Sequence, residues 1–214
     1  MHNVELVHVT PDAESLIAYM ARVSNPDNQD NPDCIKLIKY LIKHNHWSPF
    51  EMVNMCVQID TTRSVASQIL RHRSFSFQEF SQRYAQVVNT PSLPSFRRQD
   101  TSNRQNSIDD LNEFTQQEFQ IRTQHLFDES LALYNEMLAA GVAKECARDV
   151  LPLSTPTKLY MNGTLRSWLH YTDLRCANGT QLEHQLIATG VNGLIRTHFP
   201  LVAEAMWPSE VVKK

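Results

Sequence analysis

Glycine is scarce in this chain, with five in 214 residues, about a third of the share usual in globular proteins. None of the five belongs to a G-x-G-x-x-G turn, which binds dinucleotides, or to a G-x-x-x-x-G-K-[ST] loop, which cradles phosphates. The sequence therefore has neither glycine-rich nucleotide element. Any nucleotide that the chain binds must be held mainly by side chains.

Hydrophobic patterning predicts strands and helices in one domain that spans residues 1–214. Every second residue from Val53 to Ile59 is apolar, which is typical of a half-buried strand. We expect two further strands at 4–9 and 157–161. Apolar residues at helical spacing predict helices at 62–70, 107–140, 142–149, 165–174 and 181–199. The expected fold class is α+β.

Capping residues and prolines mark where several helices begin. Thr10-Pro11-Asp12 predicts a helix with Thr10 as its N-cap, and Asn31-Pro32-Asp33 repeats the device before a second helix. Ser107-x-x-Asp110 predicts the start of the longest helix, and Gly141 predicts its end. The polar stretch 89–107 is expected to be a long loop.

Charge and hydropathy limit the class of protein. The net charge is −3, the mean hydropathy is −0.39, and no apolar run approaches the roughly 18 residues that a membrane span needs. The first residues lack the pattern of a secretory signal. We expect no membrane contact and a cytoplasmic location, or the host cytoplasm if the source is a virus.

Cysteine and histidine spacing does not predict a metal site. Cys34, Cys56, Cys146 and Cys176 form no C-x-x-C pair, and the histidines form no H-E-x-x-H element. We interpret the cysteines as reduced structural residues, because free cysteine among apolar neighbours behaves as a small hydrophobe.

The densest polar cluster covers residues 68–84, where three arginines, a histidine, a glutamate and several serines are interleaved with phenylalanines. Arginines this close repel one another unless an anion lies between them. Arg71 and Arg73 could also complement the C-terminal dipole of the preceding helix, but that interpretation leaves Arg83 unexplained. On chemistry alone, an anion site is the better interpretation.

Two later clusters carry further polar side chains, at 147–152 and 165–175. Arg166, His170 and Asp173 share one helix face, because they are spaced i, i+4 and i+7. Taken alone, this face would be a solvated network in which Asp173 pairs with Arg166 or Arg175.

Together these clusters resemble a known family. Arg71-His72-Arg73, seven residues and then Ser81 are similar to the R-H-R-x7-S signature of the flavin-dependent thymidylate synthases. Three other blocks resemble the family's blocks in the same order: His46-x-Ser48-Pro49-x-Glu51, Ala147-Arg148-x-x-Leu151-Pro152, and Leu165-Arg166-Ser167 through Leu174-Arg175. The resemblance spans about Arg22 to Gln185.

The resemblance implies a small, mainly antiparallel sheet flanked by long helices, and a homotetramer with shared active sites. It also implies synthesis of dTMP from dUMP, with methylenetetrahydrofolate as carbon donor, FAD as hydride carrier and NADPH as reductant. The chain shows no obvious activated cysteine, which fits a reaction driven by hydride from reduced flavin.

The resemblance also assigns site residues. Those expected to bind dUMP are Gln68, Ile69, Leu70, Arg71, Glu79, Phe80, Ser81, Gln82, Arg83, Arg148 and Arg175. Arg175 is the expected catalytic residue, because it should contact the uracil ring. Those expected to bind FAD are Ser48, Arg71, His72, Arg73, Glu79, Thr164, Leu165, Arg166 and His170. The family often has asparagine at the positions of Thr164 and His170, and some members have histidine where this chain has Gly179.

Three alternatives remain open at this point. The arginines and phenylalanines of 68–84 could bind nucleic acid, although a pI of about 6.3 argues against such a module. His72 and Glu79 could serve a phosphate-ester hydrolase, but no cluster of metal ligands supports one. The chain could also be a purely structural oligomer. Ser81 as a covalent nucleophile is disfavoured, since no base is expected beside it.

Overall fold

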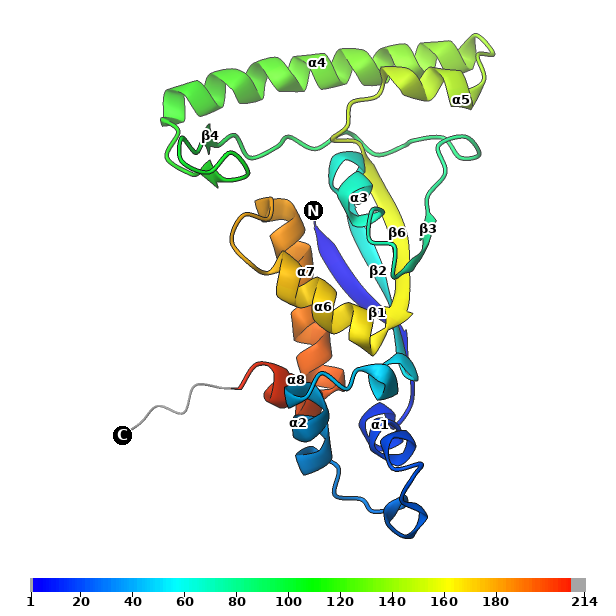
Figure 1. The fold of residues 1–214 in the computed structure, drawn as a ribbon. Coiled ribbons are helices and arrows are strands. Elements are labelled where there is room, and N and C mark those ends of the chain that lie inside the picture. Colours follow the sequence, from blue (N-terminus) through cyan, green and yellow to red (C-terminus); the bar gives the residue numbers. More distant parts are fainter. Residues whose placement is uncertain (1, 209–214) are drawn as a thin grey trace.

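The computed structural model describes residues 2–208 and is built around a four-stranded sheet whose order is β1-β2-β6-β3 (Figure 1). The strands are β1 (Asn3–Val9), β2 (Asn54–Thr62), β6 (Pro156–Thr164) and β3 (Ser76–Glu79). Every neighbouring pair is antiparallel. The expected α+β class and antiparallel sheet are confirmed.

Alternation along the strands gives the sheet one apolar and one polar face. Met55, Val57 and Ile59 of β2 are fully buried, as their period of two predicts. On the opposite face, Asp60 of β2 forms an ion pair of 3.7 Å with Lys158 of β6. The main core therefore lies on one side of the sheet.

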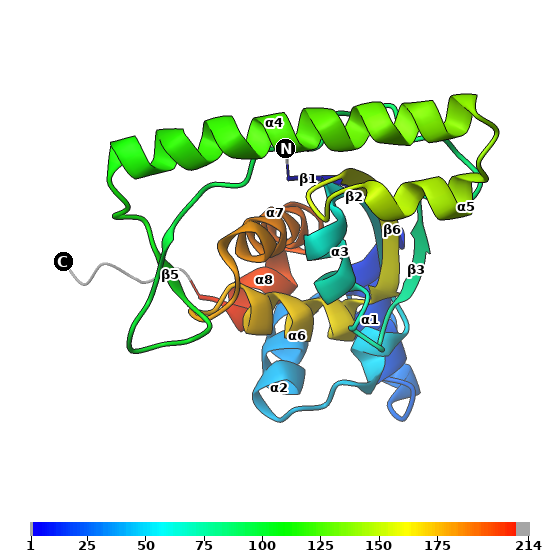
Figure 2. The same cartoon turned by 90° about the horizontal axis from the view of Figure 1, so that it is seen from above.

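Three helices cover the apolar face, namely α3 (Arg63–Ile69), α6 (Leu165–Arg175) and α7 (Leu182–His198) (Figures 1 and 2). Near one end of the sheet lie α1 (Ala13–Ala21), α2 (Ile35–Lys43), α8 (Pro200–Met206) and two 3₁₀ turns, η1 (Pro26–Asn28) and η2 (Ser48–Glu51). In α7, Ile187, Val191 and Ile195 are buried, as their helical spacing predicts.

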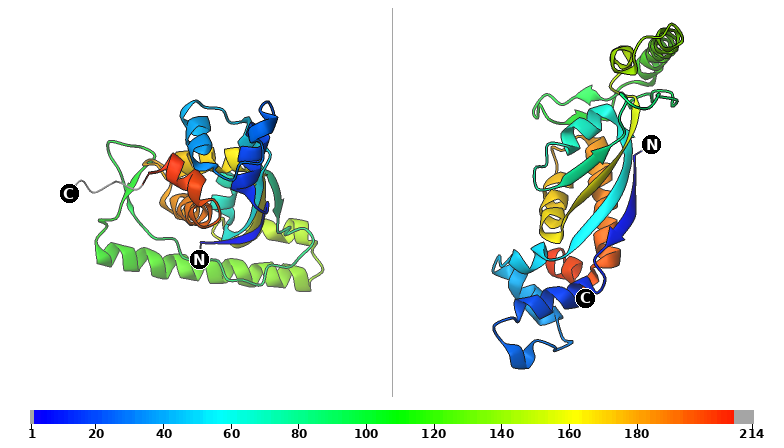
Figure 3. Two further views of the ribbon diagram at one scale, coloured as in Figure 1. Left: turned by 90° about the horizontal axis from the view of Figure 1, so that it is seen from below. Right: turned by 90° about the vertical axis from the view of Figure 1, so that its right-hand side faces the viewer.

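A long helical arm lies beyond the other end of the strands (Figures 2 and 3). It consists of α4 (Glu113–Ala139), α5 (Lys144–Ala147) and the 3₁₀ turn η3 (Arg148–Val150). Tyr134 of α4 packs with Val87 and Ala147 in a small second cluster. Most of α4 remains uncovered in the chain, including Phe114 at 76% exposure and Ile121 at 62%.

Three predicted helix starts are wrong. Asn31 does not cap the second helix, because its side-chain oxygen accepts from the Asp33 amide and α2 begins only at Ile35, after Cys34. Thr10 does not cap α1, because its hydroxyl bonds to the backbone of Asn54, and the helix begins after Asp12, whose φ is 49°. Ser107 does not start α4, because Ser107–Ile108 (β5) pairs with Arg98–Gln99 (β4) inside the stretch expected to be a loop. Asn112 caps α4 instead, by accepting a hydrogen bond from the Thr115 amide.

Besides the β4–β5 pair, the strand β3, the helix α8 and the 3₁₀ turns η1 and η2 lie where the sequence pattern predicted no element. The helix expected at 142–149 is split into the short α5 and the turn η3. Of these, β3 matters most to function, because it carries the polar cluster 68–84 into the sheet.

Candidate functional site

The loop after α3 brings the Arg71-His72-Arg73 segment onto the sheet face. Phe75 lies over Gly163 of β6, where a Cβ atom would stand 2.4 Å from Phe75 Cδ1, so only glycine allows this approach. The Phe75 and Trp168 ring centroids are 4.6 Å apart. This packing holds His72 beside the last turn of α6.

His72 contacts the residue expected to be catalytic. Arg175 Nε donates a hydrogen bond of 3.0 Å to His72 Nε2. A guanidinium only donates, so Nε2 carries the lone pair and the proton of the neutral ring lies on Nδ1. Burial and the charge of Arg175 lower the pKa of His72 to about 4. His72 is therefore a neutral acceptor at physiological pH.

The surroundings of this contact include other predicted residues. Gln68 Nε2 donates to Gln181 Oε1 at 2.5 Å. Arg71 and Arg73 are exposed, and in the described part of the chain no acidic side chain forms an ion pair with either. Both guanidinium groups are thus free to bind an anion.

A second group of predicted residues lies at the other end of α3. Arg63 Nη1 forms an ion pair of 2.7 Å with Glu79 Oε1, and Thr157 Oγ1 donates to the same oxygen at 2.9 Å. Beside them, Gln82 and Arg148 line a cavity of about 300 Å³ together with Arg63. Glu79, Gln82 and Arg148 are therefore neighbours, as the resemblance implies for a common ligand.

Ser81 and Arg83 follow directly after β3. Arg83 Nε pairs with Glu145 of α5 at 3.2 Å, and both side chains are 55% exposed. Ser81 Oγ accepts a bond of 3.4 Å from the Arg83 amide. An ion pair this exposed contributes little stability, so another anion can replace Glu145 as the partner of Arg83.

A third group surrounds the N-terminus of α6. Thr164 caps this helix by accepting from the Ser167 amide, and Arg166 pairs with Glu51 of η2, the turn that contains Ser48. His170 is exposed, with its ring 5.0 Å from that of Trp47. The Thr164, Arg166, His170 and Ser48 positions thus lie near one another. No ion pair joins Asp173 to Arg166 or Arg175 within residues 2–208.

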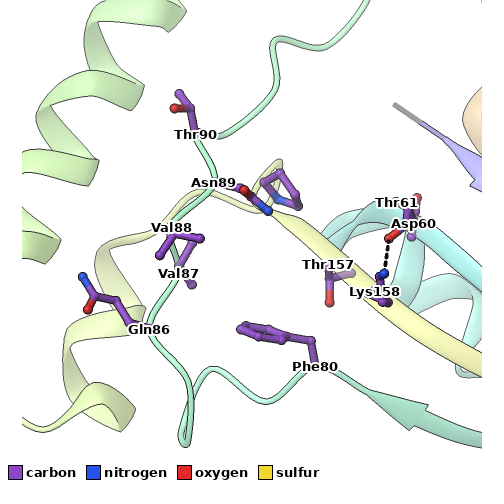
Figure 4. A pocket seen from close by; sticks show the side chains of 11 residues that line it. Asp60, Thr61, Phe80, Gln86, Val87, Val88, Asn89, Thr90, Thr157 and Lys158 are labelled. Carbon is purple, nitrogen blue, oxygen red and sulfur yellow. Dashed lines mark ion pairs between the residues drawn. The ribbon is translucent and has the colours of Figure 1, made fainter.

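Four of the predicted site residues are apolar, and their side chains differ in exposure. The side chains of Ile69 and Leu165 are fully buried in the main core, so only their backbone could reach a ligand. Leu70 is partly exposed at 38%. Phe80 lines a separate cavity of about 680 Å³, into which Figure 4 shows its ring pointing, near the Asp60–Lys158 pair.

The predicted residues do not converge on one place within a single chain. Helix α3 has seven residues, so at 1.5 Å per residue its two ends are about 10 Å apart. His72 and Arg175 lie at its C-terminal end, whereas Glu79 and Arg148 lie at its N-terminal end. One chain thus presents two half-sites at the two ends of α3, in addition to the third group at the N-terminus of α6.

Sequence reasoning missed three residues of these groups. Arg63 pairs with Glu79, and Tyr171 and His184 lie beside His72. No local signal identifies Arg63 or His184, because each meets its partner only through packing of distant segments. Tyr171 lies inside a predicted helix but next to the residues that the motifs emphasise.

The exposed arginines and the N-terminus of α6 can bind an anionic dinucleotide in place of a glycine-rich loop. Arg71 and Arg73 are exposed and form no ion pair with another described residue, and α6 is an eleven-residue helix whose N-terminus favours negative charge. Across residues 2–208 no group of three His, Cys, Asp or Glu side chains could hold a metal, and no helix could cross a membrane. All four cysteines are free; Cys34 and Cys56 are buried, whereas Cys146 is exposed.

Comparisons with known proteins agree with one another. A family model described as thymidylate synthase complementing protein matches residues 5–201. A probable flavin-dependent thymidylate synthase of Paramecium bursaria Chlorella virus 1 is 51% identical over 195 residues, which cover 91% of this chain and 90% of that protein. A flavin-dependent thymidylate synthase of Synechocystis sp. is 52% identical over 193 residues, covering 90% of this chain and 89% of that protein.

A solved structure matches nearly the whole chain. It is a crystal structure of a UMP/dUMP methylase from Streptomyces cacaoi bound with 5-Br dUMP, with a TM-score of 0.85 and 25% sequence identity. The match covers 96% of this chain and 94% of that one.

Proposed function

The chain belongs to the thymidylate synthase complementing protein family, whose relatives above are flavin-dependent thymidylate synthases, and we propose the reaction in detail from that premise. The protein is a flavin-dependent enzyme that makes dTMP from dUMP. Its carbon donor is methylenetetrahydrofolate, its flavin is FAD and its reductant is NADPH. The contact between Arg175 and His72 carries the proposal, because it joins segments 103 residues apart in the sequence.

At the C-terminal end of α3, Arg175 acts on the pyrimidine. Its guanidinium stabilises the negative charge that develops on the uracil amide during the reaction. His72 accepts from Arg175 as a neutral ring and therefore leaves the positive charge of the guanidinium uncompensated. This geometry supports Arg175 as the catalytic residue.

The flavin, when bound, supplies hydride chemistry that side chains cannot perform. Arg71 and Arg73 hold its diphosphate, because they are exposed cations without acidic partners in the described part of the chain. Thr164, Leu165 and Arg166 offer the N-terminus of α6 to the same cofactor.

At the N-terminal end of α3, the chain binds the phosphate of dUMP. Ser81 and Arg83 supply a hydroxyl and a guanidinium, and Arg148 lies across the adjoining cavity. The missed residue Arg63 orients Glu79 through their 2.7 Å contact. Phosphate binding at this half-site therefore depends on the positive charge of its arginines more than on their exact orientation.

We propose that the enzyme is a homotetramer with active sites shared between subunits. Two observations support this: the half-sites of one chain are about 10 Å apart, and α4 carries exposed apolar side chains such as Phe114, Ile121 and Leu126. Sharing predicts that two inactive variants, Arg175→Ala and Arg83→Ala, regain activity when co-expressed in one assembly. Failure to regain activity would contradict the sharing of sites.

The assembly itself is tested on α4. Ile121→Glu and Leu126→Glu place charges on the uncovered surface of α4 and should shift the sedimentation profile to smaller species, whereas exposed Glu129→Gln should not.

We also propose a cytoplasmic location, or the host cytoplasm for a viral source, which the four free cysteines support.

The reaction is tested by absorption spectroscopy and product analysis. The purified protein should show a bound flavin band, if necessary after adding FAD, and the band should bleach when NADPH and dUMP are added without oxygen. Adding methylenetetrahydrofolate should then yield dTMP. Failure to bind flavin would contradict the proposal and favour nucleic-acid binding by residues 68–84.

A further inference from the structure

A buried pair of polar rings lies beneath the Arg175–His72 contact. Tyr171 of α6 is 2% exposed and His184 of α7 is fully buried. The Tyr171 hydroxyl and His184 Nε2 are 3.1 Å apart and form a hydrogen bond between the two helices. Tyr171 lies within the 165–175 block but is not among the residues assigned to substrate or cofactor, and His184 lies outside all four blocks.

Both rings pack against His72. The Tyr171 and His72 centroids are 5.0 Å apart with planes at 78°, and the His184 and His72 centroids are 6.1 Å apart at 88°. The His72 ring therefore packs nearly perpendicular to two rings that are hydrogen-bonded to each other. The orientation of the His72 ring follows from the Tyr171–His184 pair.

The orientation of His72 in turn decides where Arg175 points. Arg175 is the last residue of α6, one turn beyond Tyr171, and its side chain is only partly buried. Within residues 2–208 its hydrogen bond to His72 is the one that the Arg175 side chain makes. Among the described residues, this hydrogen bond is therefore what fixes the orientation of the Arg175 side chain.

Packing alone does not explain the polar character of this pair. Burial raises the pKa of Tyr171, and burial together with Arg175 and His72 lowers the pKa of His184 to about 4, so both rings are neutral. His184 Nδ1 has no hydrogen-bond partner among the described residues. Phenylalanine and leucine would fill the same space without an unpaired buried polar atom.

We propose that Tyr171 and His184 are positioning residues that aim Arg175 at the pyrimidine through His72. The inference rests on the proposed function, since it takes Arg175 as the residue that contacts uracil. The pair packs on His72, which is also an expected flavin contact, but it touches neither the substrate phosphate site nor Arg71 and Arg73, which are assigned to the flavin diphosphate. Most of the expected binding contacts are therefore unchanged, and the main effect should appear in turnover.

Tyr171→Phe and His184→Leu test the pair in the full-length, flavin-loaded enzyme. Each should lower kcat for dTMP formation about tenfold, while the Kd of dUMP and the flavin content stay within about twofold of the original protein. His184→Gln retains a polar group for the Tyr171 hydroxyl and should lose less turnover than His184→Leu. If Tyr171→Phe does not fold, His184→Leu still decides the question.

Tyr134→Phe is the matched control. Tyr134 is also fully buried, and its hydroxyl accepts from the Val87 amide in the second cluster, far from His72. This variant should lose stability but retain kcat per bound flavin. A tenfold loss of kcat in Tyr134→Phe would overturn the inference, because any buried tyrosine hydroxyl would then have the same effect.

A double-mutant cycle tests the route through Arg175. In an Arg175→Lys background, Tyr171→Phe should lower the remaining kcat by less than about twofold, because the guanidinium that it aims is absent. A full tenfold loss in that background would overturn the inference. If Arg175→Lys alone leaves turnover unchanged, the proposed role of Arg175 fails and the inference fails with it. If Arg175→Lys lowers turnover but Tyr171→Phe does not, the inference alone fails.

Discussion

The two ends of α3 hold their arginines in opposite ways. At the C-terminal end, Arg175 donates to the neutral ring of His72, which rests on buried Tyr171 and His184. At the N-terminal end, Arg63 pairs with a carboxylate, and on the nearby loop Arg83 pairs with another. A neutral partner orients a guanidinium and keeps its charge available, whereas a carboxylate compensates it.

This difference matches the two parts of a nucleotide. A phosphate carries its own charge and can displace an exposed carboxylate such as Glu145, so its site can start as an ion pair. A uracil ring is neutral before reaction and develops charge only at the transition state. Its arginine must therefore be aimed in advance and left uncompensated.

The largest expected effect is at the C-terminal end of α3. Arg175→Ala should lower dTMP formation by at least about a hundredfold, as losing a transition-state donor does. The variant should fold normally, because Arg175 is only partly buried and outside the core. Turnover is measured by product analysis at saturating dUMP.

Arg98→Ala is the control for this variant. Arg98 forms an exposed two-bond contact with Asp110 and is not one of the expected site residues, so its loss should leave turnover unchanged. Retained turnover in Arg175→Ala would show that the two ends of α3 do not divide the chemistry between pyrimidine and phosphate.

A smaller effect is expected in the pH dependence of stability. His184 has its pKa lowered to about 4 in the folded protein, against 6.5 without burial, so between these values the unfolded chain binds more protons. The stability that neutral His184 contributes is complete above pH 6.5 and is lost as the pH falls towards 4. His72 adds the same trend.

Urea unfolding at several pH values and one protein concentration measures this slope. His184→Leu should reduce it by about one proton, or about 1.4 kcal/mol per pH unit within that window. Tyr134→Phe should lower stability without changing the slope. An unchanged slope in His184→Leu would mean that His184 is protonated when folded.

At the N-terminal end of α3, Ser81→Ala should weaken dUMP binding by about tenfold or somewhat more, the effect of losing one hydrogen bond to a charged group. Turnover at saturating dUMP should persist, because Arg83 and Arg148 still bind the phosphate. Binding is measured by calorimetry and turnover by product analysis. Complete loss of turnover with unchanged affinity would instead make Ser81 a covalent nucleophile.

Sequence reasoning succeeded where local pattern decides structure. The alternation of Met55, Val57 and Ile59 and the stripe of α7 depend on neighbours a few residues away, so periodicity predicts them. The Ser107 cap failed because pairing with residues 98–99 supplied a competing partner. Arg63 and His184 escaped notice because only tertiary packing brings them to Glu79 and His72.

The resemblance to a family predicted which residue types gather, but it could not predict that they divide between two ends of a helix. That division depends on the length of α3 and on the strand pairing of β3 with β6. The order of the motifs along the chain gives neither the length of α3 nor the pairing of β3 with β6. The half-sites could be recognised only in the structure.

The smallest expected effect sharpens the comparison most. Glu145→Gln removes the charge of an ion pair in which both side chains are 55% exposed, so the free energy of unfolding should change by less than about 0.5 kcal/mol. The Kd of dUMP should fall by up to about twofold, because the phosphate no longer competes with Glu145 for Arg83. Calorimetry at low and high salt isolates the competition between Glu145 and the phosphate for Arg83, since salt screening should abolish this competition. Weaker dUMP binding would mean that Glu145 orients Arg83. The N-terminal end of α3 would then be preorganised by its carboxylates, as the C-terminal end is by its histidines.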